Sequence, residues 1–189
     1  MSTISQAIVA DHRKLEKCVN EVTNNPGNQD HQQAFGNQFV WELARHSVGE
    51  ELVVYPAMDK HLGEKGREMT ESDRREHHSV KQMLKEFQDT EATDPHYVKR
   101  LKMIWERLTK HIKEEEHEHL PALEKALESA GGESQAMARS FERTKLFVPT
   151  RSHPSAGEHP PFETAMGLLA APIDRVADLF RKFPDQDRV

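Results

Sequence analysis

Apolar side chains recur every three or four residues over four long stretches of the chain, which is the spacing of one face of an α-helix. These stretches cover residues 4–22, 35–57, 69–87 and 97–115, and helix-breaking residues separate them at 24–28, 63–66, 93–95 and 131–132. Alternating β-branched runs are missing, so no strand is predicted. Asp94 before Pro95 predicts that the fourth helix begins at Pro95. Because the connections are short, the pattern predicts an all-α, up-down-up-down four-helix bundle.

Each apolar stripe is interrupted near its middle by polar side chains that face inward. A spacing of four residues places a histidine and a glutamate one turn apart on the same helix face, where both can reach one point beside the helix. In the predicted bundle these interruptions converge at about the same height. The inward residues are His12, His46, Glu50, His77, His111 and Glu115.

Two parts of the chain repeat one another at an offset of 65 residues. Asp11-His12 lines up with Glu76-His77, and His46, Glu50, Glu51 and Pro56 line up with His111, Glu115, Glu116 and Pro121. We interpret the repeat as a duplicated helical hairpin. Each proline removes a helical hydrogen bond and is expected to bend or end its helix, which would taper that end of the bundle.

Four histidines and two glutamates facing one core are the side chains of a metal site. An isolated buried carboxylate is costly to desolvate, and the interior stripes hold no lysine or arginine that could pair with Glu50 or Glu115. Two cations would supply the missing charge. The repeat suggests that His12 and His46 bind one ion, that His77 and His111 bind the other, and that the two glutamates bridge them.

Nitrogen and oxygen ligands without sulfur favour two iron ions (Fe2+ or Fe3+), or manganese, with zinc as a further alternative. Two imidazoles, one oxygen from each bridging glutamate and a bridging oxo or hydroxo group make five ligands per ion. One position on each ion would then stay open for dioxygen, peroxide or nitric oxide.

At these residues the chain resembles the hemerythrin-like family of HHE cation-binding domains. The likeness covers Ile4 to about Glu128 and rests on Asp11-His12, the run from His46 to Glu51, Glu76-His77 and the run from His111 to Glu115. It implies a four-helix bundle with a non-haem di-iron centre and an oxygen-related function. The C-terminal part is similar to extensions on fungal members.

The sequence departs from the oxygen carriers of that family on the third helix. Those proteins carry two histidines four residues apart there, whereas this chain has Asp73 four residues before His77 and Lys81 four residues after it. Asp73 could complete the ligand set, but an acidic residue in the first turn of a helix commonly compensates the helix dipole, and this is the interpretation we favour. A missing imidazole would let both metals admit water or substrate, which argues against simple reversible oxygen carriage.

Several residues near the predicted site have a plainer interpretation. We expect Glu51 and Glu116 to flank the core at the solvent boundary, with an outer hydrogen bond to a ligand imidazole as the alternative. Tyr55 is expected to serve packing. His78, His117 and His119 are expected to be exposed, and His153 and His159 could reach the bundle only if the C-terminal part folds back over it.

The chain divides into a hemerythrin-like bundle over residues 1–130 and an extension over 131–189. The extension is predicted to contain a short helix over 133–147, a proline-rich strap over 148–161 and a final helix over 162–183, packed on the bundle as a strap and lid. With 189 residues, one domain and an appendage is the expected organisation.

Composition narrows the classes of partner. The chain has 26 basic and 32 acidic residues, a net charge of −6, without a basic stripe for nucleic acid. Cys18 stands alone, which excludes disulfide frameworks and thiolate clusters and fits a reducing compartment. The first residues lack the apolar run of a signal peptide, and no segment approaches the roughly 20 apolar residues of a membrane span. We therefore expect a soluble, cytoplasmic protein without membrane or nucleic-acid partners, and protein partners stay unknown.

The sequence thus predicts a di-iron protein that binds or senses dioxygen or a related small oxidant. Two alternatives stay open. One is an enzyme that activates oxygen or decomposes peroxide or nitric oxide at the same site. The other is an iron-responsive interaction or iron-buffering module that uses the C-terminal extension. A bundle without metal would require the inward glutamates to be protonated or hydrated.

Overall fold

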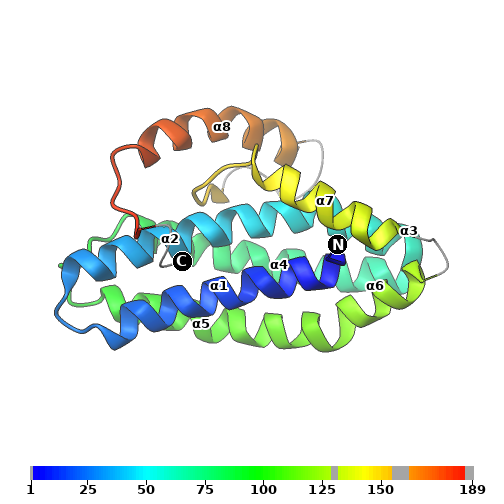
Figure 1. Cartoon of the computed structure of the whole chain (residues 1–189), viewed down its shortest axis with the longest axis horizontal. Coiled ribbons are helices and arrows are strands. Elements are labelled where there is room, and N and C mark those ends of the chain that lie inside the picture. The colour runs from blue at the N-terminus through cyan, green and yellow to red at the C-terminus, as the bar shows by residue number, and fades with distance from the viewer. Residues whose placement is uncertain (1, 129–131, 155–161, 186–189) are drawn as a thin grey trace.

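The computed structural model describes residues 2–128, 132–154 and 162–185, with side chains in the last range described from residue 169 onward. The first hairpin comprises α1 (Ile4–Asn24), α2 (Gln29–Gly49), the π-helical segment η1 (Glu50–Val54) and α3 (Tyr55–Leu62). The second comprises α4 (Glu64–Gln88), α5 (Tyr97–Glu114), the π-helical segment η2 (Glu115–His119) and α6 (Leu120–Leu127). The helices α7 (Glu133–Lys145) and α8 (Phe162–Asp178) follow. Figure 1 shows the two hairpins side by side, which confirms the predicted all-α bundle.

Local sequence signals fix most helix ends. Thr3 and Gln6 form a capping box at the start of α1, in which each side chain accepts a hydrogen bond from the other residue's backbone N–H. At Gly63 the backbone has φ +62°, a conformation that favours glycine, and the chain reverses there from α3 into α4.

The predicted start of the fourth bundle helix is wrong by two residues. α5 begins at Tyr97 rather than Pro95. Asp94 instead organises a turn, because its carboxylate accepts a hydrogen bond from His96 N at 2.7 Å and its carbonyl accepts one from Tyr97 N at 3.0 Å.

The two prolines do not end their helices. Pro56 and Pro121 each follow a π-helical turn, in which the N–H of the preceding residue bonds the carbonyl of the glutamate five residues back. A proline cannot donate to the carbonyl four residues back, and its ring would clash with it. The wider turn moves that carbonyl aside, so the chain stays helical and changes direction, as Figure 1 shows between α5 and α6.

The interior consists of two apolar clusters with a polar layer between them. One cluster draws on α1, α2, α4 and α5 and includes Phe39 and Leu84. The other draws on α1, η1, α3, α6 and α7 and includes Ile8 and Leu123. The predicted site residues lie between the clusters along the helices, so apolar side chains keep this layer dry from both sides.

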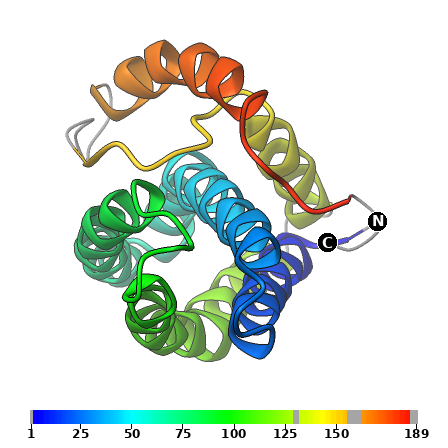
Figure 2. The same cartoon turned by 90° about the vertical axis from the view of Figure 1, so that its left-hand side faces the viewer.

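The C-terminal part lies outside the bundle. α7 packs across α1, α2 and η1. In Figure 2 the strap over residues 148–154 runs between the bundle and α8. His159 and the rest of the predicted strap fall outside the described residues. In the described parts of the chain, no helix is both long and apolar enough to cross a membrane.

Candidate metal centre

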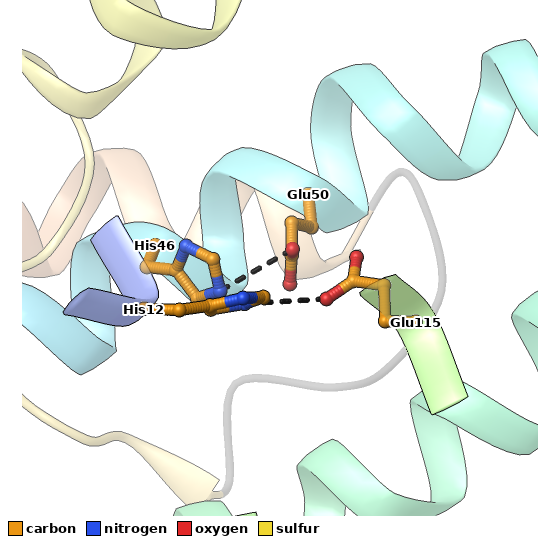
Figure 3. Close-up of side chains that lie close together, drawn as sticks. All are labelled: His12, His46, Glu50 and Glu115. Carbon is orange, nitrogen blue, oxygen red and sulfur yellow. Dashed lines mark ion pairs between the residues drawn. The ribbon is translucent and has the colours of Figure 1, made fainter. Parts of the chain in front are cut away.

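The six inward residues predicted from the sequence lie together in the bundle core. Potential ligand atoms of His12, His46, Glu50 and Glu115 lie within 4.8 Å of one another, and the same holds for Glu50, His77 and His111. Glu50 belongs to both groups and therefore stands between them. All six side chains are buried, none with more than 3% of its surface exposed. Figure 3 shows the rings of His12 and His46 and the carboxylates of Glu50 and Glu115 turned toward one another.

Each imidazole turns its Nε2 atom toward a central carboxylate. The Nε2 of His12 lies 3.3 Å from Glu115 Oε2, and the Nε2 of His46 lies 3.2 Å from Glu50 Oε1. On the other side, His77 Nε2 is 3.5 Å from Glu50 Oε2 and His111 Nε2 is 4.0 Å from Glu115 Oε2. Each hairpin therefore supplies one glutamate, and each glutamate faces a histidine from both hairpins.

The opposite ring nitrogens face a second set of carboxylates. His12 Nδ1 lies 2.8 Å from Glu116 and His77 Nδ1 lies 3.1 Å from Glu51, two positions that the 65-residue repeat relates. The favoured expectation that Glu51 and Glu116 merely border solvent is wrong, and the alternative of an outer hydrogen bond is confirmed. A carboxylate that accepts the Nδ1 proton fixes the tautomer in which Nε2 is free to bind a cation.

The acidic residues that precede the histidines of α1 and α4 face the other two Nδ1 atoms, one within hydrogen-bonding distance and one slightly beyond it. His111 Nδ1 lies 3.1 Å from Glu76 Oε2, and His46 Nδ1 lies 3.6 Å from Asp11 Oδ2. The sequence showed both acids as part of the repeat but gave no role for them, because their partners come from the neighbouring helix.

Several of these outer carboxylates are in turn neutralised by cations. The Nη2 atom of Arg13 donates hydrogen bonds to both carboxylate oxygens of Glu116, at 2.7 and 2.6 Å. The ammonium of Lys81 donates one to Glu51 at 2.8 Å. Asp11 binds the ammonium of Lys145, which is buried at the end of α7. Lys145 lies outside the repeat and more than a hundred residues from Asp11, so no periodicity pointed to it.

α7 also covers the His46 side of the site. The ring of Phe141 meets the His46 ring edge-on with centroids 6.1 Å apart. A Cβ at Gly49 would lie 2.8 Å from Phe141, so glycine beside Glu50 is what lets α7 approach so closely. The repeat places the exposed Glu114 at the equivalent position of the second hairpin.

Three polar side chains beside the second hairpin's histidines correct the sequence prediction. His119 is buried rather than exposed, and its Nδ1 lies 3.0 Å from Asp73 Oδ2. The helix continues past η2, which keeps position 119 four residues from Glu115 on the inward face. Tyr55 does more than pack, since its hydroxyl lies 3.3 Å from both ring nitrogens of His77.

The predictions for four further residues near the site have mixed outcomes. The favoured interpretation of Asp73 as a first-turn acid is wrong, because α4 begins at Glu64 and Asp73 lies well inside it. Its Oδ1 lies 3.7 Å from His111 Nδ1, on the outer side of that ring rather than among the clustered potential ligand atoms. His117 is exposed as expected, and His78 is half-buried. His153 folds back with the strap but binds Asp174 of α8 at 3.0 Å, away from the metal-type cluster.

Comparison with known proteins agrees with this geometry. The model of the hemerythrin HHE cation binding domain matches residues 3–123. The chain belongs to the hemerythrin HHE family. It is 53% identical over 184 residues to an uncharacterized hemerythrin-like protein of Schizosaccharomyces pombe (strain 972 / ATCC 24843), covering 97% of this chain and 89% of that one.

A solved structure shares the fold. It is a hemerythrin HHE cation binding domain-containing protein from Mycobacterium kansasii, with a TM-score of 0.62 and 21% sequence identity. The match covers 77% of this chain and 89% of that chain. α7, α8 and the strap lie beyond the residues that the HHE family model matches, so Lys145 and Phe141 are additions to the part that defines the family.

The buried groups of this HHE domain carry strongly shifted pKa values. Burial and the charge of Glu115 raise the pKa of Glu50 well above its usual range. Burial would raise the pKa of Glu115 too, but the imidazole of His12, 3.3 Å away, and the charge of His111 outweigh that effect and lower it. The surroundings therefore favour the neutral form of Glu50 and the ionised form of Glu115.

The pKa values of the histidines are likewise shifted in different directions. Burial lowers the pKa of His46, and burial together with the charge of His111 lowers that of His77. Burial acts on His111 as well, but the Glu76 hydrogen bond and the charges of Glu115 and Asp73 outweigh it and raise the pKa of His111 to about 9.

A cation fits the chemistry of this donor set. Both oxygens of Glu50, Oε2 of Glu115 and Nε2 of His12 and His111 are buried without a hydrogen-bond partner. An unsatisfied buried polar atom costs about 1–3 kcal/mol, and a protein core rarely concentrates several of them. All of these atoms are lone-pair donors of the nitrogen and oxygen type, so bound cations would satisfy them together. The HHE domain is thus a metal-binding bundle whose clustered donors are those that the repeat predicts.

Proposed function

We propose that this HHE protein is a non-haem di-iron protein that binds or senses dioxygen or a related small oxidant in the core of its bundle. In this proposal His12 and His46 hold one ion, His77 and His111 hold the other, and Glu50 and Glu115 bridge the two. The observation that carries the proposal is the set of orphaned, buried nitrogen and oxygen atoms converging from both hairpins. A bound pair of iron ions would supply redox chemistry and open coordination positions to a small ligand.

The chain's own residues prepare the site. Glu116, Glu51 and Glu76 accept the Nδ1 protons of His12, His77 and His111, so these rings present Nε2 to the centre in a fixed orientation. The apolar clusters on either side exclude bulk water. A small apolar molecule such as dioxygen passes through a dry core more readily than a charged or bulky one, which supports a diatomic or similarly small ligand.

Metal content tests the proposal directly. Protein loaded anaerobically with ferrous iron should hold two ions per chain, and the His46→Ala and His111→Ala variants should each hold one fewer. His117→Ala is the matched control, since His117 is exposed, lies outside the cluster, and should leave the content at two. Loading far below two ions in the wild type, with circular dichroism showing a folded chain, contradicts the proposal.

The optical spectrum before and after admission of air tests the ligand. A stable new absorption that reverses when the gas is removed supports binding or sensing. An unchanged spectrum in the fully iron-loaded protein removes dioxygen as the ligand while leaving the metal site intact, after which nitric oxide and peroxide are the ligands to test.

A second candidate is an enzyme that activates oxygen or decomposes peroxide or nitric oxide. The hydroxyl of Tyr55 and the Asp73–His119 pair favour it, because they place hydrogen-bonding groups beside His77 and His111 where a reacting ligand could exchange protons. Sustained consumption of peroxide or nitric oxide by iron-loaded protein, reduced in Tyr55→Phe, supports catalysis. A ligand that stays bound without consumption rejects it.

A further inference from the structure

In the part of α8 whose side chains the structure describes, the carboxylates face the protein and the large apolar side chains face solvent. Asp174 is buried and accepts hydrogen bonds from the backbone N–H groups of Thr150 and Arg151 at 3.1 and 3.2 Å. Asp178 accepts one from the hydroxyl of Thr150 at 2.7 Å. The carboxylates of the helix are thus used to hold the strap, which is the reverse of the usual arrangement on a surface helix.

The outward face is a continuous apolar stripe. Leu169, Ile173 and Val176 of α8 and Phe180 in the turn that follows it are spaced by four, three and four residues, and Leu179 lies beside them. These five side chains are 59–87% exposed. Scattered apolar residues on a surface need no explanation, but a contiguous patch of this kind marks an interaction site.

Contacts in the C-terminal half of α8 and just beyond its end keep this face turned outward. The strap is fixed to the bundle because the hydroxyl of Ser152 donates to the carbonyl of Lys81 at 2.6 Å. At the far end, Asn37 of α2 donates to the carbonyl of Lys182 at 2.8 Å. Figures 1 and 2 show α8 lying outside the bundle, with the strap beneath it. Rolling the helix to bury its apolar face would break the bonds to Asp174 and Asp178.

The spacing of the stripe points to its occupant. Alternating steps of four and three residues are the pattern of a seam at which one helix packs along another. We propose that the outward face of α8 binds the same face of a second copy of the chain, forming a symmetric dimer. Self-pairing puts the same uncharged patch on both sides, and like charges are not brought together along the seam. The positions beside it hold Ala170, Pro172, Ala177 and Leu179.

The size of the face is sufficient for such a contact. Five side chains of this type expose on the order of 100 Å² each, so two copies would bury about 1,000 Å², near the lower limit for a specific interface. A lipid bilayer fits less well. Amphipathic membrane helices carry many cations on their polar side, whereas the polar side of α8 holds Asp174 and Asp178, and the whole chain has a net charge of −6.

Sedimentation velocity of the full-length protein tests the dimer. The wild type should sediment at twice the chain's 21.7 kDa at concentrations of tens of micromolar, which is roughly the affinity range that an interface of this size reaches. Ile173→Glu places a charge on the seam and should yield a monomer. Arg175→Glu is the matched control, an equally exposed residue of the same helix off the seam, and it should stay dimeric.

The outcomes separate the dimer from its alternatives. A wild type that stays monomeric at these concentrations, or an Ile173→Glu variant that stays dimeric, overturns the proposal. Should Ile173→Glu fail to fold by circular dichroism, the milder Phe180→Ser must weaken the dimer by about tenfold or more for the proposal to stand. A monomeric wild type that cosediments with phosphatidylserine-containing vesicles would assign the face to a membrane surface instead.

Discussion

The two hairpins of the bundle present the same histidine and glutamate side chains in different surroundings. The first hairpin flanks its histidines with Ile8 and Val54, whereas the repeat places Asp73 and His119 at the equivalent positions of the second. α7 seals the His46 side through Phe141 and Lys145, while the equivalent side of the second hairpin, at Glu114 and Glu76, reaches solvent. The clustered histidines and glutamates are alike in the two hairpins, whereas the residues around them differ.

We expect the largest loss of stability on replacing Lys145, the buried cation that lies beside the first hairpin and has no equivalent beside the second. Lys145→Met leaves the buried carboxylate of Asp11 with only the more exposed ammonium of Lys14, at 3.0 Å, and losing the buried partner of such an ion pair costs up to about 3–5 kcal/mol. Urea denaturation of metal-free protein measures the loss. The double variant Asp11→Asn with Lys145→Met removes both charges and should recover most of it. A double variant no more stable than the single one would contradict the pairing.

Two histidines related by the repeat should respond to pH in opposite directions. The folded pKa of His111 is raised to about 9 from 6.5, so its stabilising effect is present below pH 6.5 and lost as the pH rises toward 9. The pKa of His46 is lowered, so stability falls as the pH drops below 6.5. Metal-free protein should therefore lose up to roughly 1.4 kcal/mol per pH unit between pH 7 and 9. Glu76→Gln should abolish that loss, and a flat profile in the wild type would refute it.

The central glutamates should differ once the metal is absent. Glu115→Gln removes a carboxylate that is ionised against His12 and His111, at a cost of about 2–3 kcal/mol. Glu50→Gln replaces a group whose raised pKa already favours its neutral form, so metal-free stability should change by less than about 1 kcal/mol. Both variants should lose metal, as measured by elemental analysis. Equal destabilisation of the metal-free protein would show that the two glutamates carry equal charge.

The smallest expected effect comes from making the second hairpin resemble the first. Asp73→Ile strands the buried Nδ1 of His119 and should cost about 1–2 kcal/mol. Adding His119→Val completes the exchange to the residues of the first hairpin and should restore stability to within about 1 kcal/mol. Thermal melts of the three proteins compare them. Two additive losses would mean that Asp73 and His119 act independently.

Periodicity and the internal repeat were enough to predict the bundle and its six inward donors, because each of those residues is defined by its place on its own helix. The residues that contact the outer ring nitrogens of the histidines were harder to predict from the sequence. Whether Glu51 reaches His77 depends on how α4 is rotated against α2, which the pattern of one helix does not contain. Lys145 and Phe141 come from a helix without any repeat to relate it to the site. His119 was misassigned because Pro121 was expected to bend the helix away before that residue could face the core.

The two π-helical turns set how their helices continue beyond the central glutamates. Each turn inserts one residue beyond the α-helical count, which rotates all later side chains by about 100° around the helix axis. Glu50 and Glu115 are the first residues of these turns, with one apolar cluster anchoring the helices before them and the other anchoring the helices after them. Because α1 and α4 run through the carboxylate layer without such a turn, the two π-helical turns set the directions of α3 and α6 relative to it. A change in the distance between the two glutamates would be transmitted along both helices to α3 and α6 at the far end.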